Sequence, residues 1–247
     1  MTTVRVRFSK TGKVRFTSHR DVARIWERAL RRAEIEVAYS EGFSPHPKLH
    51  FGLALSTTYE SLGEYLEIDL APGVAVDPDA LPDRLTPALP VGFQALAAAI
   101  VEPGSESLQA SVTSCSWRVE VADVTEPELA DAVDRALAAE HLVVTRQRKG
   151  RDVTDDLRPD VIDLRAAGTT DRGAWFEAEL GTQPRTLRPA ELVAALGDGW
   201  VEGRVVRTHQ WIVHEDARRE PLPWADLPEL ALPAWSPSGS LAEARAS

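Results

Sequence analysis

Two hydrophobic patterns follow one another near the N-terminus, and their order restricts the fold more than any other feature of the chain. Val4, Val6 and Phe8 alternate with polar residues, which is typical of a strand with one buried face. Apolar residues then recur every three or four positions between Val22 and Ala33, as in a helix with one buried side. Ser18 is suited to cap this helix. The patterns predict a strand followed by an amphipathic helix.

The same kind of pattern continues to residue 101. Extended segments are predicted at 14–16, 36–39, 49–55, 64–70 and 93–101, with a helix at 78–89. The elements can be combined in the order βαββαβ, which is the order of a ferredoxin-like unit with two helices on one face of an antiparallel sheet. We therefore expect residues 1–101 to form a basic ferredoxin-like domain.

Residues 102–110 have the composition of a linker, and a similar order of elements starts again at Ser111. Strands are predicted at 111–121, 142–146, 161–165, 174–180 and 203–213, and helices at 127–140 and 189–196. The two halves share this order without a repeated sequence. The predicted class is α+β, with two tandem ferredoxin-like units and antiparallel sheets, the second at 111–215.

The C-terminal residues differ from both halves. From Asp216 onward the chain has five prolines, and Trp224 and Trp235 lie among polar residues. This composition predicts an extended tail at 216–247, which could dock back onto the protein through its tryptophans.

Charge is distributed unevenly along the chain. The net charge is −10, yet the first 52 residues carry eleven Lys/Arg and only five Asp/Glu. An acidic protein as a whole repels nucleic acid, so a basic block at one end indicates a local surface for phosphate or RNA.

Several classes of protein are excluded by composition. Cys115 is the only cysteine, so this chain cannot form an internal disulfide or a cysteine-ligated zinc or iron–sulfur site by itself. No stretch reaches the roughly 20 apolar residues of a membrane span, and the first residues lack the apolar core of a signal peptide. We expect a cytoplasmic protein without a cofactor.

The first helix carries the clearest candidate site. At 100° per residue its arginines fall within about 120° of one another, opposite the apolar side; they are Arg20, Arg24, Arg28, Arg31 and Arg32. A solvated face partly neutralised by Asp21 and Glu27 is the alternative. Other basic residues nearby in sequence favour anion binding; they are Arg5, Arg7, Lys10, Lys13 and Arg15.

The second candidate is the segment from Gly42 to Lys48. Its two prolines hold Ser44 and His46 in extended conformations, so the loop is stiff. Phe43, Ser44, His46 and Lys48 could bind single-stranded RNA, with the aromatic ring stacking on a base. Alternatively, the segment is a rigid connection with Phe43 in the core.

A long ordered motif carries a family resemblance. It comprises Arg15–Asp21, Glu27–Ala33, Val37–Lys48 and Ser61–Leu66, with shorter similarity at Arg148–Gly150 and Asp156–Pro159. The chain closely resembles the radical-SAM-linked protein family, a bacterial domain of unknown function. In that family the domain is often fused to, or encoded beside, a radical SAM protein, near ribonuclease E/G-type and ribosomal-protein genes. The resemblance implies an RNA- or ribosome-related role.

The cysteine count refines this implication. A radical SAM cluster needs three closely spaced cysteines, so such chemistry would belong to a separate polypeptide. The expected partners are therefore RNA and, beyond it, a separate radical SAM protein or ribonuclease E/G-type machinery. We expect no membrane partner.

Two weaker patterns remain. Arg148, Lys149, Arg151 and Arg158 form a second basic cluster, but aspartates are interleaved with them, so a charged hairpin is an equal alternative. His19, His46 and His50 are spaced poorly for a metal site, and we expect none.

Three functions fit these observations. The first is a non-catalytic accessory protein that binds RNA or the ribosome. The second is a metal-independent endoribonuclease, because paired ferredoxin-like domains with a basic cleft resemble the Cas6-type CRISPR endoribonucleases. His19 and His46 would then be acid and base, with Tyr39 nearby and Lys48 stabilising charge. The third is a protein-interaction adaptor whose arginines meet an acidic partner.

Overall fold

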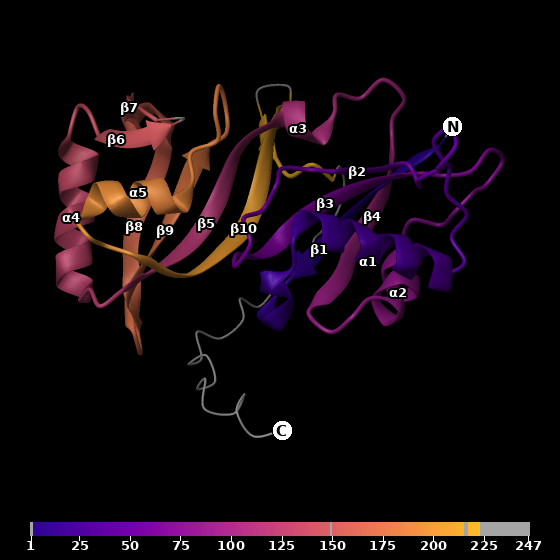
Figure 1. Cartoon of the computed structure of the whole chain (residues 1–247), viewed down its shortest axis with the longest axis horizontal. Coiled ribbons are helices and arrows are strands. Elements are labelled where there is room, and N and C mark those ends of the chain that lie inside the picture. The colour runs from indigo at the N-terminus through magenta and orange to yellow at the C-terminus, as the bar shows by residue number, and fades with distance from the viewer. Residues whose placement is uncertain (1, 149, 215–216, 223–247) are drawn as a thin grey trace.

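The computed structural model describes residues 2–148, 150–214 and 217–222, with the backbone alone at 146–148, 151 and 214. The fold is α+β and is built on a mostly antiparallel sheet of nine strands (Figure 1). Seven of these strands lie in the order β4-β1-β3-β10-β5-β9-β8. Of the other two, β2 pairs with β3 and β11 pairs with β10. Of the named pairs, β10 with β3 is parallel and the others are antiparallel.

The first half places two helical segments on one face of its strands. Its elements are β1 (Thr3–Lys10), η1 (Gly12–Phe16), α1 (His19–Arg32), β2 (Leu49–Phe51), β3 (Glu60–Asp69), α2 (Leu81–Leu85), η2 (Thr86–Ala88) and β4 (Phe93–Val101). Val4, Val6 and Phe8 of β1 are buried in one core with Trp26 and Leu30 of α1. The ring centroids of Phe8 and Trp26 are 4.9 Å apart. The predicted alternation along β1 therefore faces α1.

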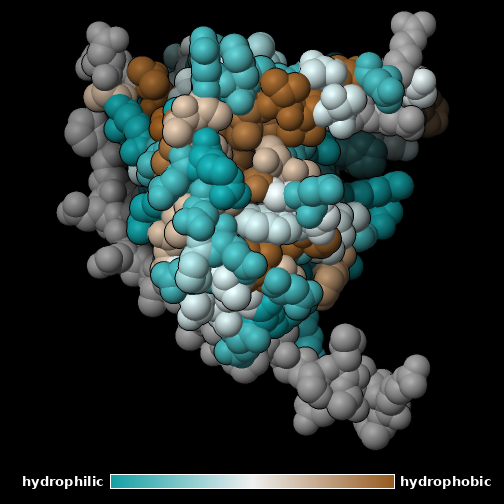
Figure 2. All heavy atoms as spheres, turned by 90° about the vertical axis from the view of Figure 1, so that its left-hand side faces the viewer, coloured by the Kyte–Doolittle hydropathy of each residue, from teal (hydrophilic) through white to brown (hydrophobic). Residues whose placement is uncertain are grey.

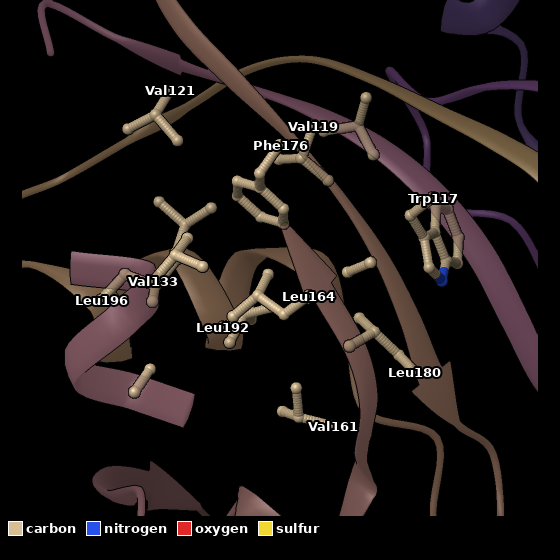
Figure 3. Packing of buried hydrophobic residues seen from close by; sticks show 14 of the residues in the cluster. Trp117, Val119, Val121, Val133, Val161, Leu164, Phe176, Leu180, Leu192 and Leu196 are labelled. Carbon is tan, nitrogen blue, oxygen red and sulfur yellow. The ribbon is translucent and has the colours of Figure 1, made fainter. Parts of the chain in front are cut away.

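The second half has its own core. Its elements are α3 (Leu108–Ser111), β5 (Val112–Ala122), α4 (Glu126–Ala138), β6 (Val143–Arg148), β7 (Arg151–Asp156), η3 (Arg158–Asp160), β8 (Val161–Thr170), β9 (Gly173–Gly181), α5 (Pro189–Leu196) and β10 (Glu202–His214). Figure 3 shows Val119 and Phe176 of the sheet facing Val133 of α4 and Leu192 of α5. The hairpin of β6 and β7 forms a separate two-stranded sheet.

The two halves meet at neighbouring strands. Val206 and Arg207 of β10 pair in parallel with Glu60 and Ser61 of β3, which makes one continuous sheet. Figure 2 views the molecule from the α4 end, where hydrophilic and hydrophobic residues are interspersed. That end contrasts with the α1 surface described below, because neither α4 nor α5 carries a row of arginines.

Several predicted elements differ from the structure. The strand predicted at 14–16 is wrong: this segment belongs to the 3₁₀ helix η1, which begins at Gly12 with its φ of 70°. At 36–39 Val37 and Tyr39 form only isolated bridges. Pro45 and Pro47 lack N–H groups, so the segment that faces Tyr39 cannot extend the ladder.

The start of the predicted tail lies on the sheet. Strand β11 (Ala217–Arg219) pairs with β10, and Leu222 is buried beside Tyr65 and Leu108. Trp224 and Trp235, for which we predict docking, lie outside the described residues.

Candidate nucleic-acid interface

Helix α1 begins where the sequence predicts. The Oγ of Ser18 accepts a hydrogen bond from the backbone N–H of Asp21 at 3.2 Å, which satisfies one of the free N–H groups of the first turn. Val22, Trp26 and Leu30 are buried against the sheet. Because these residues fix one side of the helix, the residues of the opposite side are directed to solvent.

All five α1 arginines are exposed, as the helical period predicts. Arg24 is 3.5 Å from the carboxylate of Asp21, and Arg32 donates to the carbonyl of Ala88 at 3.3 Å. Arg20, Arg28 and Arg31 have no side-chain partner in the part of the chain that the structure describes. The guanidinium groups of Arg20, Arg28 and Arg31 are therefore open to an external anion.

Asp21 contributes one negative charge to this face. Its carboxylate accepts a hydrogen bond from the Oγ of Ser18 at 2.7 Å, and this bond is the main reason why the pKa of Asp21 is lowered. The charge of Arg24 contributes less to the shift. Ahead of the helix, the guanidinium of Arg15 lies over the ring of Phe16, 4.7 Å from its centroid.

The basic residues of β1 do not belong to this surface, which corrects the expectation that they strengthen it. Arg5 is paired with Glu67 at 2.6 Å and Arg7 with Glu220 at 2.8 Å, and both arginines are buried. Lys10 is also buried, and burial lowers its pKa. These cations stabilise the interior of the protein and are not accessible to RNA.

The loop from Tyr39 to Pro47 is closed by hydrogen bonds at its base. The N–H of Ser40 donates to the carbonyl of His46 at 2.9 Å, and the N–H of His46 donates to the Oγ of Ser40 at 3.0 Å. Phe43 is fully exposed at the tip of the loop, so the alternative in which it packs into the core is wrong.

The other candidates of this loop are arranged around its tip. Ser44 and His46 are exposed, whereas Lys48 is half-buried below them. The backbone N–H of Lys48 donates to the carbonyl of Ala38 at 2.8 Å, so this hydrogen bond joins the segments before and after the loop. The loop therefore presents an aromatic ring, a hydroxyl and an imidazole to solvent.

The structure does not bring His19 and His46 together. The ring of His19 contacts that of Phe51 at the first turn of α1, with centroids 5.1 Å apart. Pro47, next to His46, lines a pocket together with Arg31 in the last turn. His19 and Arg31 are twelve residues apart, which is about 18 Å along the helix axis. An acid–base pair made of these two histidines has no support in this geometry.

A pocket of about 420 Å³ separates α1 from the loop. Its floor is apolar, and its charged lining consists of Glu27, Arg31, Glu34 and Glu36, with Tyr39 and Pro47 beside them. Three carboxylates against one guanidinium repel phosphate. The part of α1 that suits a polyanion is therefore the row of Arg20, Arg24 and Arg28.

The second basic cluster is only partly described. Arg148 and Arg151 pair with each other across the β6–β7 hairpin through their backbones, and the side chains of both, like all of Lys149, lie outside the described part. Arg158 donates to the carbonyls of Val161 and Leu137 at 3.2 and 3.4 Å. Arg158 thus has an architectural role at the start of β8.

One charged cluster between the two halves has no signal in the sequence. Arg207 of β10 is buried and donates twice to Glu64 of β3, at 2.6 and 3.1 Å. Lys10 lies close enough to both residues for their charges to affect its pKa. The partners are 143 residues apart. Only the pairing of β3 with β10 brings them together.

Two further findings concern the described residues. No helix among them is long and apolar enough to cross a membrane. No group of three or more His, Cys, Asp or Glu side chains there is placed to hold a metal ion.

Comparison with known proteins identifies the family. Residues 3–189 match the family described as "Uncharacterized protein conserved in bacteria (DUF2344)". The chain belongs to this family. Nothing in the comparisons links the family to radical SAM proteins, and no curated protein matches the chain.

A solved structure is also similar. A chain of "Crystal Structure of a Cbf5-Nop10-Gar1 Complex" aligns with a TM-score of 0.47 and 11% sequence identity. The alignment covers 84% of this chain and 48% of that chain. This likeness is too weak to carry an argument about function.

Proposed function

We propose that this protein binds RNA through the exposed face of α1, with Arg20, Arg24 and Arg28 as phosphate contacts. The observation that carries the proposal is that Arg20 and Arg28 are exposed without a partner among the described residues, on a chain with a net charge of −10. Unpaired guanidinium groups on an otherwise acidic protein bind phosphate at one place and leave the remaining surface repulsive.

The spacing along α1 suits a nucleic-acid backbone. Arg20, Arg24 and Arg28 are four residues apart, so successive side chains lie about 6 Å from each other along the helix. A guanidinium offers a planar pair of N–H donors to phosphate oxygens. Phe43 adds an exposed ring on which a base of single-stranded RNA could stack.

The wider role follows from the sequence resemblance. In this proposal the protein is a non-catalytic, cytoplasmic accessory of RNA processing or of the ribosome, and a separate radical SAM protein or ribonuclease E/G-type machinery is its functional partner. The endoribonuclease alternative is less well supported, because His19 is in the first turn of α1 whereas Pro47, next to His46, lines a pocket with Arg31 of the last turn.

We further propose that each half is a ferredoxin-like unit, with boundaries at 1–101 and 111–215. The strand orders β4-β1-β3-β2 and β10-β5-β9-β8 support this division, since each places the first strand of its half between the last and the third. The two separate hydrophobic cores support it as well. In the second half, the β6–β7 hairpin is then an insertion after α4.

RNA binding can be tested with a fluorescein-labelled single-stranded RNA and fluorescence anisotropy over a range of salt concentrations. Arg24→Glu with Arg28→Glu should weaken binding. At about 0.7 per phosphate contact on a single strand, the slope of log K against log salt should fall by about 1.4.

A matched control changes charge elsewhere. The double variant Arg135→Glu, Arg172→Glu reverses the charge of two exposed arginines in the second half, so its net charge equals that of the α1 variant. It should leave the slope of log K against log salt unchanged. Equal losses in both double variants, or binding unaffected by the α1 variant, would refute the proposal. Cleavage of the RNA in EDTA that disappears in His46→Ala would instead favour the nuclease.

A further inference from the structure

The pocket beside the last turns of α1 has an apolar floor. Leu30 and Ile35 are buried at its base, and Val37, Ala71 and Pro47 complete the apolar lining. An aliphatic chain can pack on such a floor, while a charged group at its end stays at the rim. We call this feature the flank pocket. Its volume of about 420 Å³ is sufficient for a long side chain and part of its backbone.

The rim of the flank pocket is acidic. Glu27 is half-buried, and Glu34 and Glu36 are exposed. None of the three carboxylates forms an ion pair within the described ranges, and Arg31 supplies the single positive charge of the lining. The rim therefore carries an excess of two negative charges.

The turn after α1 brings the carboxylates of the rim together. The chain leaves the helix through Glu34, whose φ is 52°, and this turn places Glu36 beside the helix that carries Glu27. The carbonyl groups of Ala33 and Glu34 already accept hydrogen bonds from Arg84, at 2.9 and 3.5 Å, so the negative charge of the rim comes from its carboxylates. Tyr39, half of whose surface is exposed at the rim, adds an aromatic ring that a cation can approach.

We propose that the flank pocket binds the arginine or lysine side chain of a basic segment of a protein partner. The aliphatic part of that side chain packs on Leu30 and Val37, and its cationic group meets the carboxylates of the rim. RNA is a poor occupant because the same carboxylates repel phosphate.

The proposal can be tested with a fluorescein-labelled peptide that alternates arginine and glycine over twelve residues, at 150 mM salt. Combining Glu27→Gln, Glu34→Gln and Glu36→Gln should weaken its binding at least tenfold, because the cation loses its partners. Amides keep the shape of the rim. The unfolding midpoint of this variant should match that of the wild type, which shows that the loss is not one of folding.

A control separates the pocket from general charge attraction. Asp131→Asn, Asp134→Asn and Asp198→Asn together remove the same three charges at exposed positions of the second half. This variant should bind the peptide within twofold of the wild type. Equal loss in both triple variants would overturn the proposal.

Two further measurements decide between occupants. Methyl NMR signals of Leu30, Ile35 and Val37 should shift on addition of the peptide, and unchanged signals would contradict binding in the pocket. The glutamine variant should bind labelled single-stranded RNA at least as tightly as the wild type. If it lost RNA and kept the peptide, RNA would be the occupant and the proposal would be wrong.

The result is independent of the RNA proposal. Arg24→Glu with Arg28→Glu is expected to weaken RNA binding and to leave peptide binding unreduced. Either activity can therefore be lost without the other.

Discussion

Strand β1 and helix α1 both carry arginines, yet the structure gives these residues opposite surroundings. Arg5 and Arg7 of β1 are buried and paired with Glu67 and Glu220. Arg20 and Arg28 of α1 are exposed and have no partner in the described part. Arginine side chains therefore stabilise the fold in β1 and are available to a ligand in α1.

The difference depends on what covers each surface. The face of β1 that points away from α1 is covered in part by the chain after β11, where Glu220 and Leu222 lie. Nothing in the described residues covers the outer side of α1. A count of basic residues therefore overstates the binding surface, because it includes cations that are already neutralised.

The largest expected effect comes from removing a buried arginine. Arg7→Ala should lower the free energy of unfolding by about 3–5 kcal/mol, because it leaves Glu220 without its cation in a buried place. Urea denaturation measures this change. A loss below about 1 kcal/mol would mean that β1 and α1 arginines do not differ in their contribution to stability.

The next effect depends on pH and reports on His209, whose pKa is affected by the buried Arg7. Burial, with smaller contributions from the charges of Arg7 and Arg218, lowers the pKa of His209 to about 4. This is below the unfolded value of about 6.5. The neutral imidazole therefore contributes stability above about pH 6.5, and this contribution is lost as the pH falls toward 4.

His209→Gln should flatten this part of the pH–stability curve. The unfolding free energies of wild type and variant are measured from pH 7 to pH 4.5 and subtracted at each pH. Carboxylates titrate in both proteins, so their contribution cancels in this difference. In Arg7→Ala the imidazole should titrate closer to its ordinary pKa, which NMR can follow. Parallel curves for wild type and His209→Gln would contradict the assignment.

A smaller effect is expected at the start of α1. Ser18→Ala should cost about 1 kcal/mol, because the N–H of Asp21 loses its side-chain acceptor. The variant also frees Asp21 to pair more closely with Arg24. Thermal unfolding measures the first change, and an unchanged midpoint would show that Ser18 does not stabilise the helix.

The smallest effect on stability, and the sharpest contrast with Arg7, is expected on the outer face of α1. Arg24→Gln with Arg28→Gln should change the unfolding free energy by no more than about 0.5 kcal/mol, since both side chains lie in solvent. RNA binding should nevertheless weaken. If stability fell as far as in Arg7→Ala, these arginines would belong to the fold and not to a binding surface.

Helices and strands were predicted best where a single hydrophobic or capping pattern specifies them. Helix α5 and strand β4 have the predicted bounds, and α1 follows Ser18 as expected. The 3₁₀ helix at 12–16 was missed because three alternating residues also fit a short strand. Strand β7 was not listed among the predicted strands because its charged sequence has no alternating apolar face, but the charged hairpin given as the alternative for the second basic cluster is confirmed as β6 and β7.

The candidate site was predicted in part. The exposure of Arg20, Arg24 and Arg28 follows from the helical period, which needs no information from the rest of the chain. The flank pocket was not predictable, because it requires the chain after α1 to fold back so that Glu36 joins Glu27. The burial of Lys10 and its proximity to Arg207 likewise depend on strands that are far apart in sequence.

Hydrophobic spacing and capping residues determined the helix and the direction of its arginines, because these features act within a few turns of backbone. Only the tertiary structure decided which basic residues remained available, because β3 and the segment after β11 bring carboxylates from distant positions to Arg5, Arg7 and Arg207. A charge buried in the protein must be paired, whereas a charge in water need not be, and the fold determines which arginines are in each environment.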